Sequence, residues 1–183
     1  MESILEKIAE KIEYVAHEEE KELRSIGKDG GIFDMPELAF AYVCGKWIMK
    51  NCQDVFGHDD VVWQREIDLG NGGPTDLVFR LQQMNRLIAV EFKMRDKIDN
   101  YRRDVDKLLA INPDKAKNMA ITRVFCALVD TFSHKGPNDE RILALDSDPR
   151  LRSIKKERLI FDTKQKWYSS NIACVLCIWE VVP

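Results

Sequence analysis

Apolar side chains near the start of the chain recur at helical spacing. Over residues 3–25 they return every three or four positions, and the charged run HEEEKE is expected to be solvated. This pattern predicts an amphipathic helix with one solvated face. Three glycines within residues 27–31 are expected to end it.

A second helix is expected from the segment FDMPELAFAYVCGKWIMK. Asp34 is predicted to be its N-cap, with Pro36 in the first turn. At helical spacing, Glu37 shares a stripe with the apolar residues Ala41, Cys44 and Ile48. Glu37 is therefore expected to face the protein and not open water.

The middle of the chain changes to strand-like patterns. Runs at 61–68, 75–81 and 86–93 are rich in branched and aromatic residues and are joined by short polar links, which predicts an antiparallel meander. A helix is predicted over 96–111. The nearly continuous apolar run at 122–130 is typical of a strand that is covered on both faces.

The C-terminal part adds a short helix in NDERILALD and two strands in ERLIFDTK and NIACVLCIWEVV. This mixed order predicts an α/β fold in three layers, with helices on both faces of a central mixed sheet. We expect one domain over 1–183, with an N-terminal helix at 1–26 and an αβββαβ core at 34–130.

Composition restricts the cellular compartments and the binding partners that we expect for the protein. Apolar residues make up 45% of the chain, no run of eighteen apolar residues occurs, and the N-terminus lacks the pattern of a secretory signal. Five cysteines in such a chain are expected to be reduced thiols, and we expect a cytoplasmic protein with no membrane partner. The net charge is −3, yet residues 80–103 hold seven basic and three acidic residues. A locally basic face of this kind can attract phosphates.

Charged residues at the ends of apolar strands carry the candidate chemistry. Glu91 and Lys93 are two apart, so they share one face of their strand. Asp76 begins the preceding strand, and hairpin pairing can bring it near Glu91. Two close carboxylates repel, whereas a hard divalent cation such as Mg²⁺ or Mn²⁺ favours both anionic forms. Lys93 could then hold an attacking water molecule or offset negative charge on a phosphate.

These residues resemble the PD-(D/E)XK nuclease superfamily, over roughly residues 34–130. The motif reads PTD at 74–76 and EFK at 91–93, with Pro74 two positions before Asp76 and not next to it. The resemblance implies a restriction-endonuclease-like fold. It also implies that Asp76 and Glu91 bind the metal and that Lys93 serves the attacking water.

The resemblance implies further roles as well. The main-chain carbonyl of Phe92 would be a metal ligand, and Glu37 would join the site from the preceding helix. Four residues after the motif are candidates for phosphate contacts: Arg95, Tyr101, Arg102 and Arg103. The implied activity is Mg²⁺-dependent hydrolysis of phosphodiester bonds in nucleic acid, with DNA as the expected substrate and a homodimer as a plausible assembly.

Simpler interpretations stand beside this one. Asp76 could cap the GGPT turn, and Glu91 with Lys93 could form a weak exposed ion pair. An acid-x-Lys tripeptide also occurs at 19–21 and 162–164, but neither has an acidic hairpin partner before it. The protein could be a binding or scaffold protein that keeps the fold without catalysis, or an enzyme acting on another phosphate ester.

Two other segments invite functional readings. Cys174 and Cys177 form the motif CVLC, but on a strand they would point to opposite faces, so two buried thiols are favoured over a metal site. The segment PRLRSIKKER at 149–158 could bind phosphates, and a solvated basic face is an equal alternative.

Overall fold

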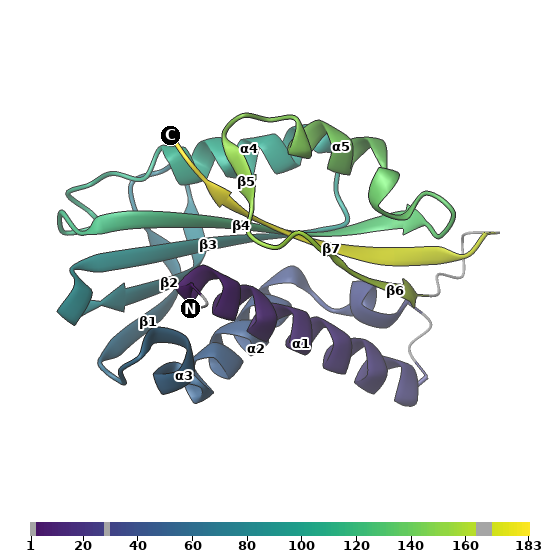
Figure 1. Cartoon of the computed structure of the whole chain (residues 1–183), viewed down its shortest axis with the longest axis horizontal. Coiled ribbons are helices and arrows are strands. Elements are labelled where there is room, and N and C mark those ends of the chain that lie inside the picture. Colours follow the sequence, from purple (N-terminus) through teal and green to yellow (C-terminus); the bar gives the residue numbers. More distant parts are fainter. Residues whose placement is uncertain (1–2, 28–29, 164–169) are drawn as a thin grey trace.

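A computed structural model describes residues 3–27, 30–163 and 170–183 and contains a mixed sheet between two layers of helices (Figure 1). The α-helices in the described ranges are α1 (Ile4–Ser25), α2 (Glu37–Lys50), α3 (Cys52–Phe56), α4 (Ile98–Leu109) and α5 (Glu140–Asp146). The strands are β1 (Val61–Asp68), β2 (Pro74–Leu81), β3 (Arg86–Met94), β4 (Ala120–Phe132), β5 (Leu151–Ser153), β6 (Leu159–Thr163) and β7 (Ile172–Val181). Short 3-10 turns lie at Gly31–Asp34, Gln82–Met84 and Gly136–Asn138.

The sheet has the strand order β1-β2-β3-β4-β7-β5, and β6 also pairs with β7. Strand β2 is antiparallel to both of its neighbours, β1 and β3, which confirms the predicted meander. Strand β4 is parallel to β3, and α4 makes the crossover between them. Strand β7 returns antiparallel to β4, and both β5 and β6 pair with its other edge.

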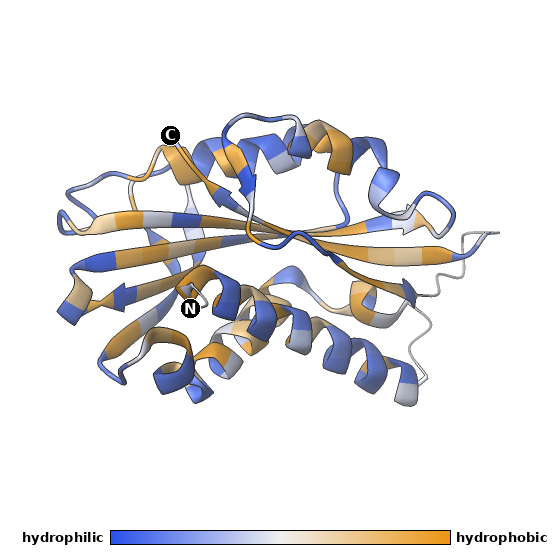
Figure 2. Ribbon diagram, in the orientation of Figure 1, coloured by the Kyte–Doolittle hydropathy of each residue, from blue (hydrophilic) through white to orange (hydrophobic). Residues whose placement is uncertain are grey.

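Helices cover both faces of this sheet. Helices α1, α2 and α3 pack on one face, where their apolar residues join those of the strands in one buried cluster. Helices α4 and α5 cover the other face through a second buried cluster. In Figure 2 the apolar side of α1 is turned toward the sheet and its polar side away from it. The prediction of a mixed α/β architecture with helices on both faces is confirmed.

Helix α1 begins as its sequence requires. Ser3 and Glu6 form a capping box, in which each side chain accepts a hydrogen bond from the main-chain N–H of the other residue. One turn later the core face starts with Ile8, Ile12 and Val15, which are buried. Burial of a side chain of this size stabilises the fold by roughly 1.5–3 kcal/mol.

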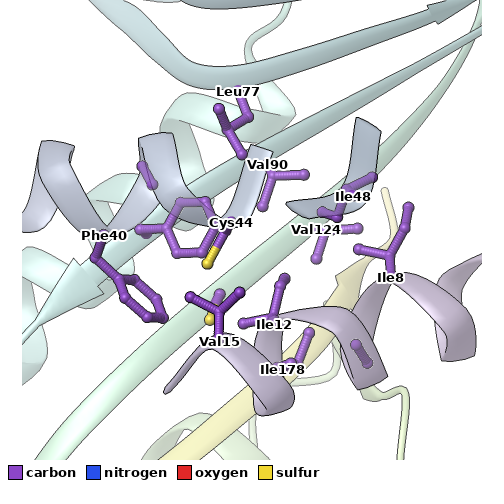
Figure 3. Packing of buried hydrophobic residues seen from close by; sticks show 14 of the residues in the cluster. Ile8, Ile12, Val15, Phe40, Cys44, Ile48, Leu77, Val90, Val124 and Ile178 are labelled. Carbon is purple, nitrogen blue, oxygen red and sulfur yellow. The ribbon is translucent and has the colours of Figure 1, made fainter. Parts of the chain in front are cut away.

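Helix α2 packs unusually close to the sheet at Gly45. Figure 3 shows Phe40, Cys44 and Ile48 of this helix beside Leu77 and Val90 of the strands. A Cβ atom on Gly45 would lie 2.3 Å from the ring of Trp63, far inside van der Waals contact. The missing side chain is therefore what allows α2 to approach Trp63 and Leu77 of the sheet at this position.

Several predicted boundaries need correction. Asp34 is not the N-cap of α2, because Pro36 occupies that position and a 3-10 turn lies before it. Asp34 instead accepts a hydrogen bond from the Gly30 N–H at 3.1 Å. Helix α3 and strand β5 were not predicted at all. None of the helices in the described ranges is long and apolar enough to span a membrane.

Candidate metal and phosphate site

Asp76 lies where two neighbouring strands separate. The ladder between β2 and β3 runs from the Leu81–Arg86 pair to the Leu77–Val90 pair and ends there. Beyond the Leu77–Val90 pair, the main-chain hydrogen bonds of the ladder are replaced by a side-chain one. The Phe92 N–H donates a hydrogen bond to Asp76 Oδ2 at 2.8 Å. Asp76 is thereby held beside the main chain that follows Glu91, as the hairpin pairing predicted.

Glu91 is almost fully buried on the face of β3 that is turned toward α4. Its side chain is 3% exposed, and the Nζ of Lys107 lies 2.8 Å from its Oε1. Burial, followed by the negative charge of Asp76, raises the pKa of Glu91 to about 8, although Lys107 acts in the opposite direction. Burial also raises the pKa of Asp76, against the lowering effect of the Phe92 hydrogen bond.

Lys93 joins the two helical layers at the end of β3. Its Nζ lies 3.3 Å from Oε1 of Glu37 on α2 and 3.2 Å from Oδ2 of Asp104 on α4. Burial by itself would lower the pKa of Lys93, but Asp104 and Glu37 outweigh that effect and raise it. The ammonium form is therefore favoured in this environment.

Glu37 faces the protein, as predicted from its helical stripe. Its Oε2 accepts a hydrogen bond from the Met94 N–H at 2.7 Å, while Oε1 contacts Lys93. Phe92, between the acid and the lysine, turns its side chain into the opposite layer and packs edge-to-face on Phe40, with 5.6 Å between ring centroids. The side chains of Glu91 and Lys93 therefore point into the site, and that of Phe92 between them points into the hydrophobic core.

Two site residues were missed by the sequence analysis. Asp104 and Lys107 are three apart on α4, so they lie on one side of that helix and extend toward Lys93 and Glu91. Burial raises the pKa of Asp104, and Lys93 partly offsets this effect. The signal in the sequence was the placement of these two charges next to the apolar stripe of Val105 and Leu108.

The predicted phosphate contacts divide into two groups. Arg95, Arg102 and Arg103 are exposed, and the guanidinium of Arg95 lies 5.8 Å from the ring centroid of Phe33. Tyr101 is different, because its side chain is fully buried and its hydroxyl accepts a hydrogen bond from the Asp96 N–H at 3.0 Å. Its apolar neighbours on α4 draw the ring into the core, so this conformation does not present Tyr101 to a phosphate.

The other predicted segments have structural partners. Cys174 and Cys177 are buried in the clusters on opposite faces of the sheet, as their spacing predicted. Most cations of the 149–158 segment contact acids, through the pairs Arg150–Asp148, Arg150–Asp106, Arg152–Glu180, Lys155–Glu13 and Arg158–Asp146. In the rival tripeptide, Asp162 accepts a hydrogen bond from the Ser133 hydroxyl at 3.2 Å, and Lys164 lies outside the described residues.

Comparison with protein-family models, curated proteins and solved structures gave no match to this chain.

The site offers buried oxygen atoms to a hard cation, but its described residues do not form a complete set of protein ligands. Oε1 of Glu91 and Oδ2 of Asp104 are buried and accept no hydrogen bond of acceptable geometry in the described part of the chain. Each of these oxygens contacts one ammonium group, that of Lys107 or that of Lys93, and a divalent cation is another positive group that such oxygens can bind. In the same part of the chain, no three His, Cys, Asp or Glu side chains already form a metal cage. Mg²⁺ commonly needs only one or two carboxylates, with water as the remaining ligands.

Proposed function

We propose that this protein is a metal-dependent nuclease that hydrolyses phosphodiester bonds in DNA, with a restriction-endonuclease-like fold of the PD-(D/E)XK type. The observation that carries the proposal is the convergence of Asp76, Glu91 and Lys93 where β2 and β3 separate. Apart from the short helix α3 after α2, the order is α2, β1, β2, β3, α4, β4, with two antiparallel pairings and then a parallel one, and this order supports the αβββαβ core.

Asp76 and Glu91 are the proposed ligands of Mg²⁺ or Mn²⁺, and the Phe92 carbonyl is a further oxygen donor on the same strand. A bound divalent cation would supply Lewis-acid stabilisation of the negative charge that develops on the phosphate. Glu37 has both oxygens engaged, by Lys93 and by the Met94 N–H. Its proposed contribution is therefore to hold Lys93 in place and to add negative charge near the cation.

Lys93 is proposed to act as a charged donor. Asp104 and Glu37 hold its ammonium group from two sides and raise its pKa, so the neutral amine that a general base requires is disfavoured at neutral pH. A positioned ammonium group can orient an attacking water molecule by donating a hydrogen bond to the water oxygen. It can also offset the charge that builds up on the phosphate oxygens.

The proposal of DNA as the substrate rests on exposed cations that follow the motif in the chain. Arg95, Arg102 and Arg103 follow Lys93 in the chain, and their exposed guanidinium groups can neutralise DNA phosphates. Cleavage of both strands of a duplex would use two such sites, so a homodimer belongs to the proposal. A cytoplasmic location is part of it as well.

Cleavage assays test the proposal directly. Plasmid DNA and single-stranded DNA are incubated with wild type, Glu91→Gln, Lys93→Met and Lys46→Met, each with Mg²⁺, with Mn²⁺ and with a chelator. Lys46 is exposed on α2 and serves as the matched control for loss of a lysine. We expect metal-dependent cleavage by wild type and Lys46→Met, and a loss of roughly 10²-fold or more in the two site variants. Equal cleavage by all four proteins would point to a contaminant and contradict the proposal.

A second candidate function is a binding or scaffold protein that keeps the fold without catalysis. The observation in its favour is the contact of Lys107 with Glu91, which partly neutralises the acidic site without any metal. Titration with Mn²⁺ separates the two functions. A nuclease should bind Mn²⁺ and lose that binding in Asp76→Ala and Glu91→Ala, whereas a scaffold should show no binding in any of the three proteins.

A further inference from the structure

We propose that Lys107 is an internal counter-ion that occupies the cation position of the acidic site and must move away before a divalent ion can bind. This inference rests on the proposed metal site. It concerns a residue outside the acid-x-Lys motif, and it assigns to that residue the control of metal affinity.

The position of Lys107 supports this role. Helix α4 directs its side chain to the gap between β2 and β3, where Nζ lies 2.8 Å from Glu91 Oε1 and donates a hydrogen bond to the Pro74 carbonyl. The charge of Lys107 lowers the pKa values of Asp76, Glu91 and Asp104 alike. The ammonium group therefore lies against Glu91 and against the main chain two residues before Asp76, close to where a cation bound by Asp76 and Glu91 would lie.

Lys107 does not satisfy the site completely. Glu91 Oε1 lies 2.8 Å from Lys107 and Asp104 Oδ2 lies 3.2 Å from Lys93, but neither contact meets the geometric criteria of a hydrogen bond. Lys107 contacts Glu91 and Lys93 contacts Asp104, while Asp76 accepts its hydrogen bond from the main-chain N–H of Phe92; burial raises the pKa values of all three carboxyl groups. A divalent cation brings twice the charge and a larger number of oxygen contacts, so it can replace the ammonium at a net gain.

Lys107 also has a route out of the site. Its side chain is 18% exposed, in contrast to 3% for Glu91, and its head group is carried on a flexible four-carbon stem. Rotation of that stem can move the ammonium into water without displacing α4. The two proposed metal ligands, Asp76 and Glu91, are on β2 and β3, which the sheet holds in place.

The consequence is a competition between Lys107 and the metal. In wild type, part of the binding energy of the metal is spent on breaking the contacts of Lys107. A residue of similar length without charge removes the competitor, and Met is the closest match in shape. An arginine keeps the charge and should keep the competition.

Isothermal titration of the full chain with Mn²⁺ tests this proposal on wild type, Lys107→Met, Lys107→Arg and the control Lys46→Met. We expect Lys107→Met to bind Mn²⁺ roughly tenfold to a hundredfold more tightly than wild type. Lys107→Arg and Lys46→Met should stay close to the wild-type affinity. Affinity of Lys107→Met that is equal to or weaker than that of wild type would overturn the role of Lys107 while leaving the metal site standing.

Thermal unfolding gives a second readout, because it measures stability without metal and the stabilisation by metal separately. In chelator, Lys107→Met should melt at a lower temperature than wild type, because Glu91 loses its buried partner. Mn²⁺ should raise its melting temperature by more than it raises that of wild type. If Lys107→Met is unfolded in chelator, Mn²⁺ should restore its fold, and failure to do so counts against the proposal. Folded wild type and Lys107→Met that both fail to bind Mn²⁺ would reject the metal site itself.

Discussion

The carboxylate of Asp76 accepts a hydrogen bond from the main-chain N–H of Phe92 at 2.8 Å, at the point where β2 and β3 cease to pair. An acidic side chain thus replaces one rung of the ladder and anchors the two strands together. The same bond holds Asp76 next to Glu91, so one residue has both a structural and a proposed chemical role.

These two roles of Asp76 can be separated by substitution. Asp76→Ala leaves the buried Phe92 N–H without an acceptor and should lower the free energy of unfolding by about 1–3 kcal/mol. Asp76→Asn keeps a carbonyl oxygen that can accept this hydrogen bond, so it should lower the free energy of unfolding by less than Asp76→Ala does. Both variants should lose Mn²⁺ binding, because both lack the charge. Urea denaturation and Mn²⁺ titration measure the two effects. A destabilisation by Asn as large as that by Ala would contradict the structural role.

The buried position of Glu91 predicts a dependence of stability on pH. Its pKa is about 8 in the folded protein and near its ordinary value of 4.5 in the unfolded chain. Between these values the folded state holds a proton that the unfolded state releases, so the free energy of unfolding falls as pH rises from about 5 to 8. The slope from one such group is at most about 1.4 kcal/mol per pH unit.

Glu91→Gln removes this titrating group and keeps the shape of the side chain. In the presence of a chelator, its free energy of unfolding should fall less steeply over the same pH range than that of wild type. Urea denaturation at several pH values measures both slopes. Parallel curves for the two proteins would show that Glu91 does not titrate in this range.

Exposed arginines on α4 should set the affinity for DNA. Arg102→Ser with Arg103→Ser should weaken binding to DNA of any sequence and reduce the slope of log K against log salt by about 2. Fluorescence anisotropy at several salt concentrations measures both quantities. Arg152→Ser is the control, because Arg152 is exposed on β5 and lies 3.7 Å from Glu180. An equal effect of the control would place the DNA-binding face on the 149–158 segment instead.

Gly45 offers a test of the packing between α2 and the sheet. At a solvent-exposed position inside a helix, Gly→Ala usually stabilises the helix by up to about 1 kcal/mol. Here the added Cβ would lie 2.3 Å from the Trp63 ring, so Gly45→Ala should destabilise by about 1–3 kcal/mol. A second substitution, Trp63→Leu, should recover part of that loss. Thermal or urea unfolding measures the coupling, and a more stable Gly45→Ala variant would contradict the close approach.

Local patterns in the sequence were sufficient for most of the fold. The alternation in β1 to β3 and the short links between them predicted the hairpins, and hairpin pairing then predicted that Asp76 comes near Glu91. The helical stripe of Glu37 predicted that its carboxylate turns inward. Each of these inferences used residues that are close in sequence or joined by a short turn.

Long-range contacts could not be predicted in the same way. Asp104 and Lys107 reach the site only because α4 crosses over the sheet at a particular angle, and no local pattern specifies that angle. Tyr101 was a candidate for phosphate contact, but the apolar face of α4 buries its side chain. The prediction of Asp34 as the N-cap of α2 was wrong because Pro36, two residues later, has the extended conformation of an N-cap residue and occupies that position.

The location of a bound cation tests the central claim most directly. Crystals soaked in Mn²⁺ would give an anomalous scattering peak that marks the ion without reference to the sequence motif. We expect one peak within about 2.0–2.3 Å of carboxylate oxygens of both Asp76 and Glu91, with Lys107 turned away. A well-ordered site with no peak, or a peak bound to other residues only, would contradict the account.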